Sequence, residues 1–539
     1  MKRFTNSVLG TAGLAMLLLG GCKKDSGTTA EVDPTKPLTP FSCATPAPST
    51  DYSLYPLGNG GSGVGDVMPY YDATSGLTYL YYLRDVYQGP TQRHPVYAYT
   101  TSNFASYVPT ASGEVLSSSS AACAQDMAIG TGSVVQRNGT YYFFYSGDNA
   151  NAASCNNRKQ GVLLATATGP DQKYTKQTSF TTIYPPDNLG YDFNDNFRDP
   201  YVYLNTTTNQ YVMLVAARKN VGNGVFKGVV AQFTSANLLN WTYQSVLYDG
   251  GFDTYFNMEC PSVFKLGNTY YLMFSDQDSQ RVFYRKSSSP NGPWSYPSGP
   301  NRFDGNGFYA AKVVTDRNND SYISAWVNRL NDGTDTGGRM FGGNLVSHKL
   351  YQLPNGDLAV TIPAALKTAL EAKPAGLHVN AQAGNTTTTG TNTFTLNSAT
   401  GSFLNSVVFD PITAPRFKVS TTVNYSSATK DFGFMLGACD NYSGFYSLRF
   451  VPSQNRFSLD RTSRDNVTLS STTTDVPFKL SPNTDYTVDI VEENSVVVVY
   501  LNNVAALTCR VYRAPQSSWG LFADNATATF KNVTVTTAQ

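Results

Sequence analysis

Three carboxylates open short strand-like segments in a chain that has few charged side chains. Asp66, Asp199 and Glu259 each begin such a segment, although charged residues make up only 14% of the sequence. The neighbours of Glu259 are apolar, and removing a carboxyl group from water raises its pKa. A carboxyl group of this kind can protonate a leaving oxygen while a second, ionised carboxylate attacks carbon or activates water. These residue types therefore indicate glycoside hydrolysis.

The residues beside the other two carboxylates suggest different roles for them. Gly63 and Gly65 precede Asp66 and leave room for a close approach, so we expect Asp66 to be the nucleophile. Arg198 precedes Asp199, and its charge is expected to keep that carboxylate ionised. An ionised Asp199 would bind sugar hydroxyls and favour the positive charge that develops on the sugar.

A loose internal repeat predicts how these distant residues come together. An aromatic strand recurs five times at intervals of about 50 to 70 residues, and a second short strand precedes each copy. The preceding strands open at Asp66, Thr131, Asp199, Glu259 and Tyr309. Five such pairs predict a five-bladed β-propeller, in which the first strand of each blade lines a central channel. The three carboxylates are then expected at equivalent positions of blades one, three and four, whereas any one of them alone would more often cap a turn.

The last part of the chain has a different pattern. After about residue 374, short segments alternate apolar and polar residues between Thr-, Ser- and Asn-rich turns, which predicts a β-sandwich. We therefore expect an all-β protein, with a catalytic propeller over residues 51–373 and a C-terminal sandwich over residues 374–539. The sandwich is either a structural partner of the propeller or a carbohydrate-binding module.

The N-terminus looks like a processing signal. Lys2 and Arg3 precede an apolar stretch that closes on Leu19-Gly20-Gly21-Cys22, which resembles the lipobox of bacterial lipoproteins. We expect residues 1–22 to be a signal peptide that ends at the lipidated Cys22, and residues 23–50 to be a flexible linker poor in apolar side chains. The protein would then be held by its lipid at the bacterial cell envelope, on the periplasmic or the surface face of the outer membrane.

Charge and cysteine content exclude several classes of partner and cofactor. The chain has 39 basic and 38 acidic residues, a balance that gives no support for nucleic-acid binding. Three histidines and no Cys-x-x-Cys pair argue against a metal site, and we expect no cofactor. Apart from Cys22, the cysteines are even in number, and Cys123 with Cys155 and Cys439 with Cys509 are plausible disulfides. We expect a monomer whose partner is an oligo- or polysaccharide substrate.

Three motifs give the chain a resemblance to glycoside hydrolase family 32, the invertases, inulinases and levanases. Arg198-Asp199-Pro200 is similar to the Arg-Asp-Pro motif of that family, and Glu259-Cys260-Pro261 is similar to its Glu-Cys motif. Gly65-Asp66-Val67-Met68-Pro69 stands where the family has its first motif. The resemblance implies a five-bladed propeller followed by a β-sandwich, with Asp66 as nucleophile, Asp199 as transition-state stabiliser and Glu259 as acid/base. It also implies cleavage of β-fructofuranosidic bonds in levan, inulin or sucrose with retention of configuration.

The first motif departs from the family pattern, so other activities stay open. The family normally has Asn-Asp-Pro-Asn-Gly there, and the asparagine that helps to hold the sugar is replaced by Gly65. The related family 43 shares the propeller and the three carboxylates, which makes an inverting arabinosidase or xylosidase an alternative. A lipoprotein that captures glycans without turnover is a third possibility.

Further residues are candidates for substrate binding besides Arg198. Tyr145-Ser146-Gly147 resembles a Ser-Gly element in the second blade of the family. Asp126 precedes the second-blade strand and would either bond a sugar hydroxyl or serve a turn. His94 would line the pocket or lie in an exposed loop, and Tyr309 would offer a ring to the sugar or pack in the core.

Overall fold

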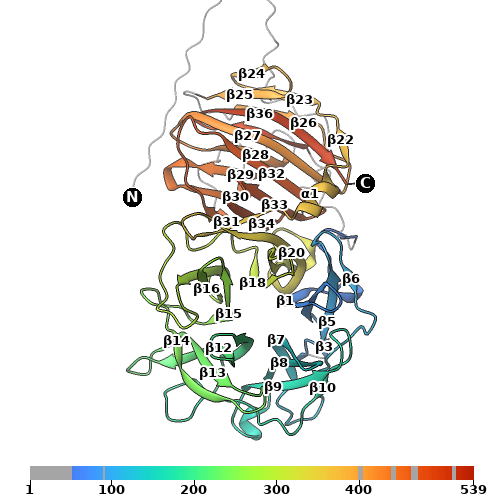
Figure 1. Cartoon of the computed structure of the whole chain (residues 1–539). Helices are drawn as coiled ribbons and strands as arrows, with labels where there is room; N and C mark the ends of the chain where they lie inside the picture. Colours follow the sequence, from blue (N-terminus) through green and yellow to red (C-terminus); the bar gives the residue numbers. More distant parts are fainter. Residues whose placement is uncertain are drawn as a thin grey trace, which may run out of the picture.

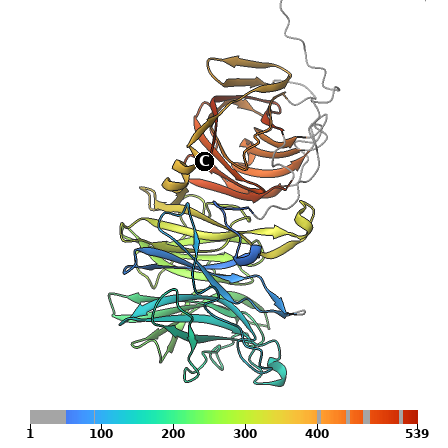
Figure 2. The ribbon, with the colours of Figure 1, turned by 90° about the vertical axis from the view of Figure 1, so that its right-hand side faces the viewer.

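The computed structural model describes residues 51–88, 91–398, 405–438, 445–462, 472–512 and 518–538. These residues form two β-domains that lie one above the other in Figure 1. The view in Figure 2, turned by 90°, shows the same two domains from the side. The expected signal peptide, Cys22 and the linker fall outside the described residues, so the lipid anchor stays a prediction. In the described ranges, no helix has the length and apolar character that a membrane crossing requires.

The first domain consists of five blades of antiparallel strands. Blade 1 consists of β1 (Val64–Asp72), β2 (Leu77–Arg84), β5 (Val96–Thr101) and β6 (Val108–Pro109). Blade 2 consists of β7 (Ala128–Arg137), β8 (Thr140–Asp148), β9 (Gln160–Ala167) and β10 (Thr175–Lys176). Blade 3 consists of β11 (Phe197–Asn205), β12 (Gln210–Asn220), β13 (Phe226–Ser235) and β14 (Thr242–Tyr248). Blade 4 has β15 (Met258–Leu266), β16 (Thr269–Asp276) and β17 (Arg281–Ser287). Blade 5 has β18 (Tyr309–Thr315), β19 (Ser321–Leu330), β20 (Arg339–Gln352) and β21 (Leu358–Thr361).

Minor elements of this domain are the hairpin of β3 (Tyr87–Gln88) with β4 (Thr91–Gln92) and the 3₁₀ turns η1 (Asn59–Gly61), η2 (Ala152–Ser154) and η3 (Asn331–Gly333).

The first strands of the five blades form a closed ring. β1 contacts β7, β7 contacts β11, β11 contacts β15, β15 contacts β18, and β18 returns to β1. Figure 1 shows β1, β7, β15 and β18 around the centre of the domain. A single backbone pair between Val64 and Gly343 joins blade 1 to blade 5. The five-bladed propeller predicted from the repeat is thus confirmed.

Every one of these inner strands carries an irregularity close to its start. The register with the second strand of the blade shifts between Val64 and Val67, Gly130 and Gly132, Arg198 and Tyr201, Glu259 and Ser262, and Tyr309 and Lys312. Such bulges re-aim side chains, and they are frequent beside active sites. The registers also correct one expectation. Glu259, like Arg198, still pairs with the second strand of its blade just before the bulge. Asp66 and Asp199 lie within the bulges of β1 and β11. The three carboxylates therefore do not occupy equivalent positions.

The second domain is a sandwich of two antiparallel sheets. One sheet contains β22 (Lys373–Ala375), β24 (Thr386–Thr389), β25 (Thr393–Asn397), β27 (Arg416–Ala428), β32 (Tyr486–Glu493), β33 (Val496–Leu501), β34 (Ala505–Arg510) and β36 (Ala526–Thr537). The other contains β23 (Val379–Ala383), β26 (Asn405–Phe409), β28 (Phe432–Ala438), β29 (Phe445–Val451), β30 (Arg456–Thr462), β31 (Thr472–Pro477) and β35 (Ser518–Ala523). The helix α1 (Ala364–Leu370) connects the domains, and η5 (Pro452–Gln454) is a short turn between β29 and β30. Aromatic and branched side chains from both sheets form the core between them.

The sandwich packs directly against the propeller. Val346 and Leu350 of β20 belong to the same buried apolar cluster as Val498 and Tyr500 of β33. His348 adds a polar link, because its Nδ1 lies 3.0 Å from the hydroxyl of Tyr500. This shared core favours the structural role of the sandwich over that of an independent binding module.

A buried glutamate ties the start of the propeller chain to the sandwich. The carboxylate of Glu493 accepts the backbone N–H groups of Ser53 and Tyr55, each at 2.7 Å, and that of Leu54 at 3.0 Å. Arg416 neutralises it through an ion pair of 2.6 Å. Glu493 therefore fixes where the chain enters the first blade.

One of the two expected disulfides is formed. Cys123 and Cys155 are joined and close a loop beside blade 2, with a sequence separation of 32. Cys509 is a buried free thiol, and its expected partner Cys439 lies outside the described residues.

Candidate active site

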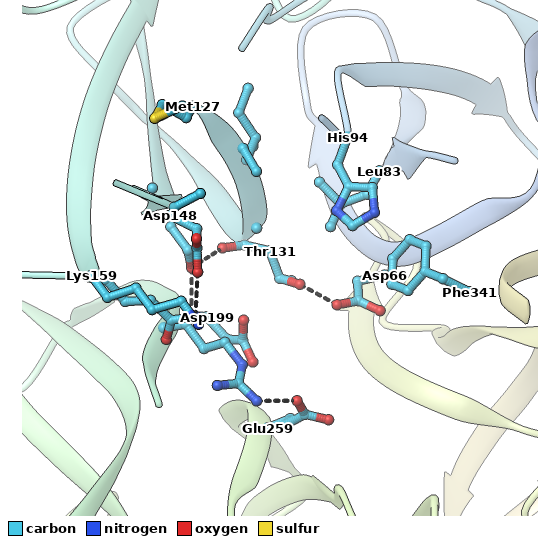
Figure 3. A pocket seen from close by; sticks show the side chains of 18 residues that line it. Asp66, Leu83, His94, Met127, Thr131, Asp148, Lys159, Asp199, Glu259 and Phe341 are labelled. Carbon is cyan, nitrogen blue, oxygen red and sulfur yellow. Dashed lines mark hydrogen bonds and ion pairs between the residues drawn. The ribbon is translucent and has the colours of Figure 1, made fainter. Parts of the chain in front are cut away.

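A cavity of about 510 Å³ opens at the mouth of the propeller channel, where the inner strands begin. All three predicted carboxylates line it, and they reach it from three different blades (Figure 3). Ser146 and Asp148 contribute from the end of β8, and Phe341 contributes from β20. The ring of inner strands thus brings together acids that lie up to about two hundred residues apart in the sequence.

Two hydrogen bonds hold Asp66 in place. The Thr131 hydroxyl donates to its Oδ2 (Figure 3). The indole N–H of Trp326 donates to its Oδ1 at 3.0 Å. Gly65, which precedes Asp66, was expected to leave room for a close approach to that carboxylate. A Cβ on Gly65 would lie 2.3 Å from the ring of Phe341, so the space it leaves accommodates that ring and not the substrate.

Asp199 is buried and is fixed through its backbone and its carboxylate. Its N–H donates to the Ser146 hydroxyl at 2.7 Å, and its Oδ2 accepts the N–H of Cys260 at 3.0 Å. The Ser146 hydroxyl donates in turn to the carbonyl of Thr131 at 2.8 Å. Burial raises the pKa of Asp199 above its usual value, although the charge of Arg198 opposes the rise. Ser146 therefore positions Asp199 as well as lining the pocket.

Glu259 shares two strong polar contacts. Arg198 donates to its Oε1 at 2.5 Å, and the Tyr309 hydroxyl donates to its Oε2. Burial is the largest influence on Glu259 and raises its pKa to about 7, with the Arg198 charge opposing and the negative charge of Asp199 reinforcing the rise. A carboxyl group with this pKa can give a proton to a leaving oxygen and take one back from water at neutral pH.

Arg198 contacts Glu259 directly and acts on the neighbouring Asp199 through its charge. Its guanidinium also donates to Asn196 at 2.9 Å and to Gln277 at 2.8 Å, which fixes its orientation. These contacts direct the guanidinium towards blade 4. The ion pair of Arg198 is with Glu259, and its charge also opposes the rise in the pKa of Asp199, in the direction expected from the sequence.

The other candidates for substrate binding have different surroundings. His94 lines the cavity and stacks on Phe341 with ring centroids 4.3 Å apart, and burial lowers its pKa to about 4. Tyr309 reaches Glu259 and lies edge-on to Trp326. Asp126 is not part of the cavity wall. Its carboxylate pairs with Lys176 at 2.6 Å and accepts the Tyr145 hydroxyl at 3.1 Å, which favours a structural role.

Several residues of the site escaped the sequence analysis. Asp148 and Gln160 line the cavity and are joined by a hydrogen bond of 3.0 Å, and Lys159 beside them pairs with Asp195 at 2.7 Å. Asp148 follows Ser146 by two residues at the end of a strand, and side chains two apart on a strand share a face. That spacing is the signal that could have found it.

A buried lysine lies beneath the carboxylates. Lys312 is only 1% exposed, and its ammonium donates to the carbonyl of Gly132 at 2.7 Å. Burial lowers its pKa, whereas the charge of Asp199 opposes this effect. In the part of the chain that the structure covers, no group of three or more His, Cys, Asp or Glu side chains is placed to hold a metal ion.

Comparison with known proteins relates both domains of the chain to one family. The model described as "Glycosyl hydrolases family 32 N-terminal domain" matches residues 119–344, and that described as "GH32, BT1760-like, C-terminal domain" matches residues 356–535. The sucrose-6-phosphate hydrolase of Escherichia coli is 28% identical over 214 residues, which are 36% of this chain and 41% of that protein. A levanase of Bacillus sp. (strain L7) is 32% identical over 127 residues, which are 23% of this chain and 12% of that protein. The chain therefore matches less than half the length of these two relatives.

A solved structure shares the fold over nearly the whole chain. The β-fructofuranosidase of Aspergillus kawachii in complex with glycerol aligns with a TM-score of 0.68 and 17% sequence identity. The alignment covers 94% of this chain and 98% of that one. At this identity the likeness shows the architecture, that is, a propeller followed by a β-sandwich.

Proposed function

Because the chain belongs to glycoside hydrolase family 32, we propose that it hydrolyses β-fructofuranosidic bonds of fructans or sucrose with retention of configuration. The observation that carries the proposal is the pairing of two carboxyl groups in one cavity. Glu259 has a pKa raised to about 7, and Asp66 is held by Thr131 and Trp326 with its carboxylate at the cavity wall.

The proposed reaction has two steps. Glu259 gives its proton to the glycosidic oxygen while a carboxylate oxygen of Asp66 bonds to the anomeric carbon, and the leaving alcohol departs. Glu259, now ionised, takes a proton from water, which attacks the same carbon and releases fructose and Asp66. Asp199 stabilises the positive charge that develops on the fructosyl ring in both steps.

The charge of the cavity supports a neutral sugar as substrate. Four carboxylates line it, those of Asp66, Asp148, Asp199 and Glu259, against the two cations Lys159 and Arg198. Both cations are already engaged in ion pairs with carboxylates. A phosphate dianion would meet net negative charge here, so we favour sucrose and fructans over a phosphorylated sugar.

The alternatives predicted from the sequence now have less support. Membership of family 32 argues against an arabinosidase or xylosidase like those of family 43. A pure glycan-capture protein has no need of a glutamate whose pKa burial raises to about 7. We also propose that Cys22 carries a lipid that keeps the enzyme and its products at the cell envelope.

A panel of glycans tests the proposal. Release of fructose from levan, inulin and sucrose, and of arabinose from arabinan, is measured with the wild type, with Glu259→Gln and with Glu114→Gln. Glu114→Gln makes the same change in a propeller loop outside the cavity. We expect fructose release that falls by about 10²–10⁴-fold in Glu259→Gln and is retained in Glu114→Gln. Arabinose release alone would support the family 43-like alternative, and no release from any glycan would support the capture protein.

A further inference from the structure

A phenylalanine in the segment between β14 and β15 is almost completely exposed to solvent. Phe252 is 96% exposed, although an isolated apolar ring gains nothing from contact with water. Gly250 and Gly251, which precede it, have φ values of 96° and 65° and form a sharp turn. A Cβ on Gly250 would lie 2.5 Å from the carbonyl of Asp253, so this turn requires glycine.

A buried arginine fixes the segment that carries Phe252. Arg285 is fully buried, and its Nε donates to the Tyr248 hydroxyl at 2.7 Å. Its guanidinium also donates to Asp253 at 2.9 Å and to the Tyr255 hydroxyl at 2.8 Å. Contacts on both sides of Phe252 therefore hold the segment in one conformation.

Phe252 also lies beside a second aromatic ring. The centroids of Phe252 and Tyr296 are 6.0 Å apart, and the guanidinium of Arg285 lies 3.9 Å from the centroid of Tyr296. At 96% exposure, Phe252 presents both of its faces to solvent. An exposed ring on a fixed segment indicates a binding surface, since two side-chain torsions are all that a ligand must order.

A groove of about 530 Å³ lies beside this ring, between blades 3 and 4. Gly251 lines it, so Phe252 lies at its edge. Tyr248 and Trp294 give it aromatic walls, and Asn220 and Asn291 give it amide groups.

The segment leads directly to the catalytic acid. β15 begins at Met258 and carries Glu259 as its second residue, so the segment that holds Phe252 ends at the channel mouth. Between Phe252 and Glu259 along the chain stands Phe256, which is 38% exposed and has the guanidinium of Arg218 4.0 Å from its ring centroid. A chain whose end is in the channel could therefore continue across this rim.

We propose that Phe252, Trp294 and the groove between blades 3 and 4 form a second carbohydrate site, which binds a fructan chain at a distance from the bond being cut. The proposal rests on the proposed function for the identity of the glycan. Aromatic faces flanked by amides suit a polyhydroxylated chain. Of the two lysines in the groove wall, Lys227 pairs with Asp249 at 3.2 Å and Lys219 lies over the ring of Tyr191. A protein partner would prefer a flat apolar patch, whereas this groove is hollowed and partly lined by polar side chains.

Binding and turnover are measured separately to test this site. Retardation in gels that contain levan or inulin is compared for Glu259→Gln alone and for Glu259→Gln combined with Phe252→Ala, Trp294→Ala or Leu204→Ala. Leu204 is 43% exposed and lies at the far end of β11, away from the channel mouth, so it is the matched control. We expect the first two changes to remove most of the retardation and Leu204→Ala to leave it intact.

Kinetics then separates the new site from the channel. Loss of a stacking contact is expected to raise KM for levan or inulin by about three- to tenfold in Phe252→Ala, with the KM for sucrose within about twofold of the wild type. Retardation that is absent in Glu259→Gln, or unchanged by Phe252→Ala, would overturn the proposal. Equal effects on sucrose and polymer would also overturn it, because Phe252 would then shape the channel itself. Since the gels require no turnover, failure of the proposed hydrolysis and failure of this site give different results.

Discussion

Replacing Arg198 by methionine should raise the pH at which activity is lost on the alkaline side. Glu259 must be protonated to act as the acid, and its pKa of about 7 makes kcat/KM fall as the pH rises through neutrality. At pH 8 about one tenth of the enzyme would still hold the proton. The guanidinium of Arg198, at 2.5 Å, opposes the effect of burial, and a charge this close lowers a carboxyl pKa by about one to three pH units. Without it, the alkaline midpoint should move from about 7 to about 8–10.

The assay is the initial rate of fructose release over a series of buffers, with Arg198→Lys as the matched variant. Lysine keeps the charge but loses the planar hydrogen-bonding group, so its alkaline midpoint should stay near that of the wild type while the maximal rate falls. Circular dichroism at each pH confirms that the variants remain folded. An unchanged or lowered midpoint in Arg198→Met, or the same rise in both variants, would refute the assignment of Glu259 as the titrating acid.

Three further changes test other parts of the structure. Lys312→Met removes a buried charge that lowers the pKa of Asp199, so the midpoint on the acidic side of the kcat/KM profile should move to higher pH. An unchanged acidic midpoint would contradict this effect of Lys312. Glu493→Gln weakens the charge-assisted hydrogen bonds to the N–H groups of Ser53 and Tyr55, while Arg416 keeps its ion pair with Asp51; it should cost about 1.5–3 kcal/mol in a denaturant titration, with kcat/KM retained under folding conditions. Cys123→Ser opens a loop with a sequence separation of 32 and should cost about 3–4 kcal/mol of unfolding free energy; a Tm equal to that of the wild type would contradict it.

The architecture could be predicted because its signals are local. Each blade repeats the same aromatic strand and preceding strand, so the count of blades and the ring of inner strands follow from the sequence alone. The sandwich follows from the change to short alternating strands. The convergence of Asp66, Asp199 and Glu259 follows from the propeller itself, and all three line the same cavity.

The partners within the site could not be predicted, because they depend on contacts between blades. Arg198 adjoins Asp199 in sequence, but the bulge in β11 breaks the regular alternation of side chains there, and the guanidinium pairs with Glu259 of the next blade. Lys312 looks like an ordinary strand residue until the ring of inner strands buries it beneath the carboxylates. The conformation of the loop that carries Phe252 depends in the same way on a distant residue. Arg285 lies in β17 and holds this loop by donating a hydrogen bond to Asp253.

The most direct test of the proposed mechanism is the configuration of the first product. Hydrolysis of levan or sucrose is run in water containing methanol and followed by NMR from the earliest times. Attack by Asp66 followed by a second displacement predicts methyl β-D-fructofuranoside as the initial methanol adduct, formed by the wild type and lost in Asp66→Asn. Initial formation of the α-anomer would show a single displacement and would contradict Asp66 as the nucleophile.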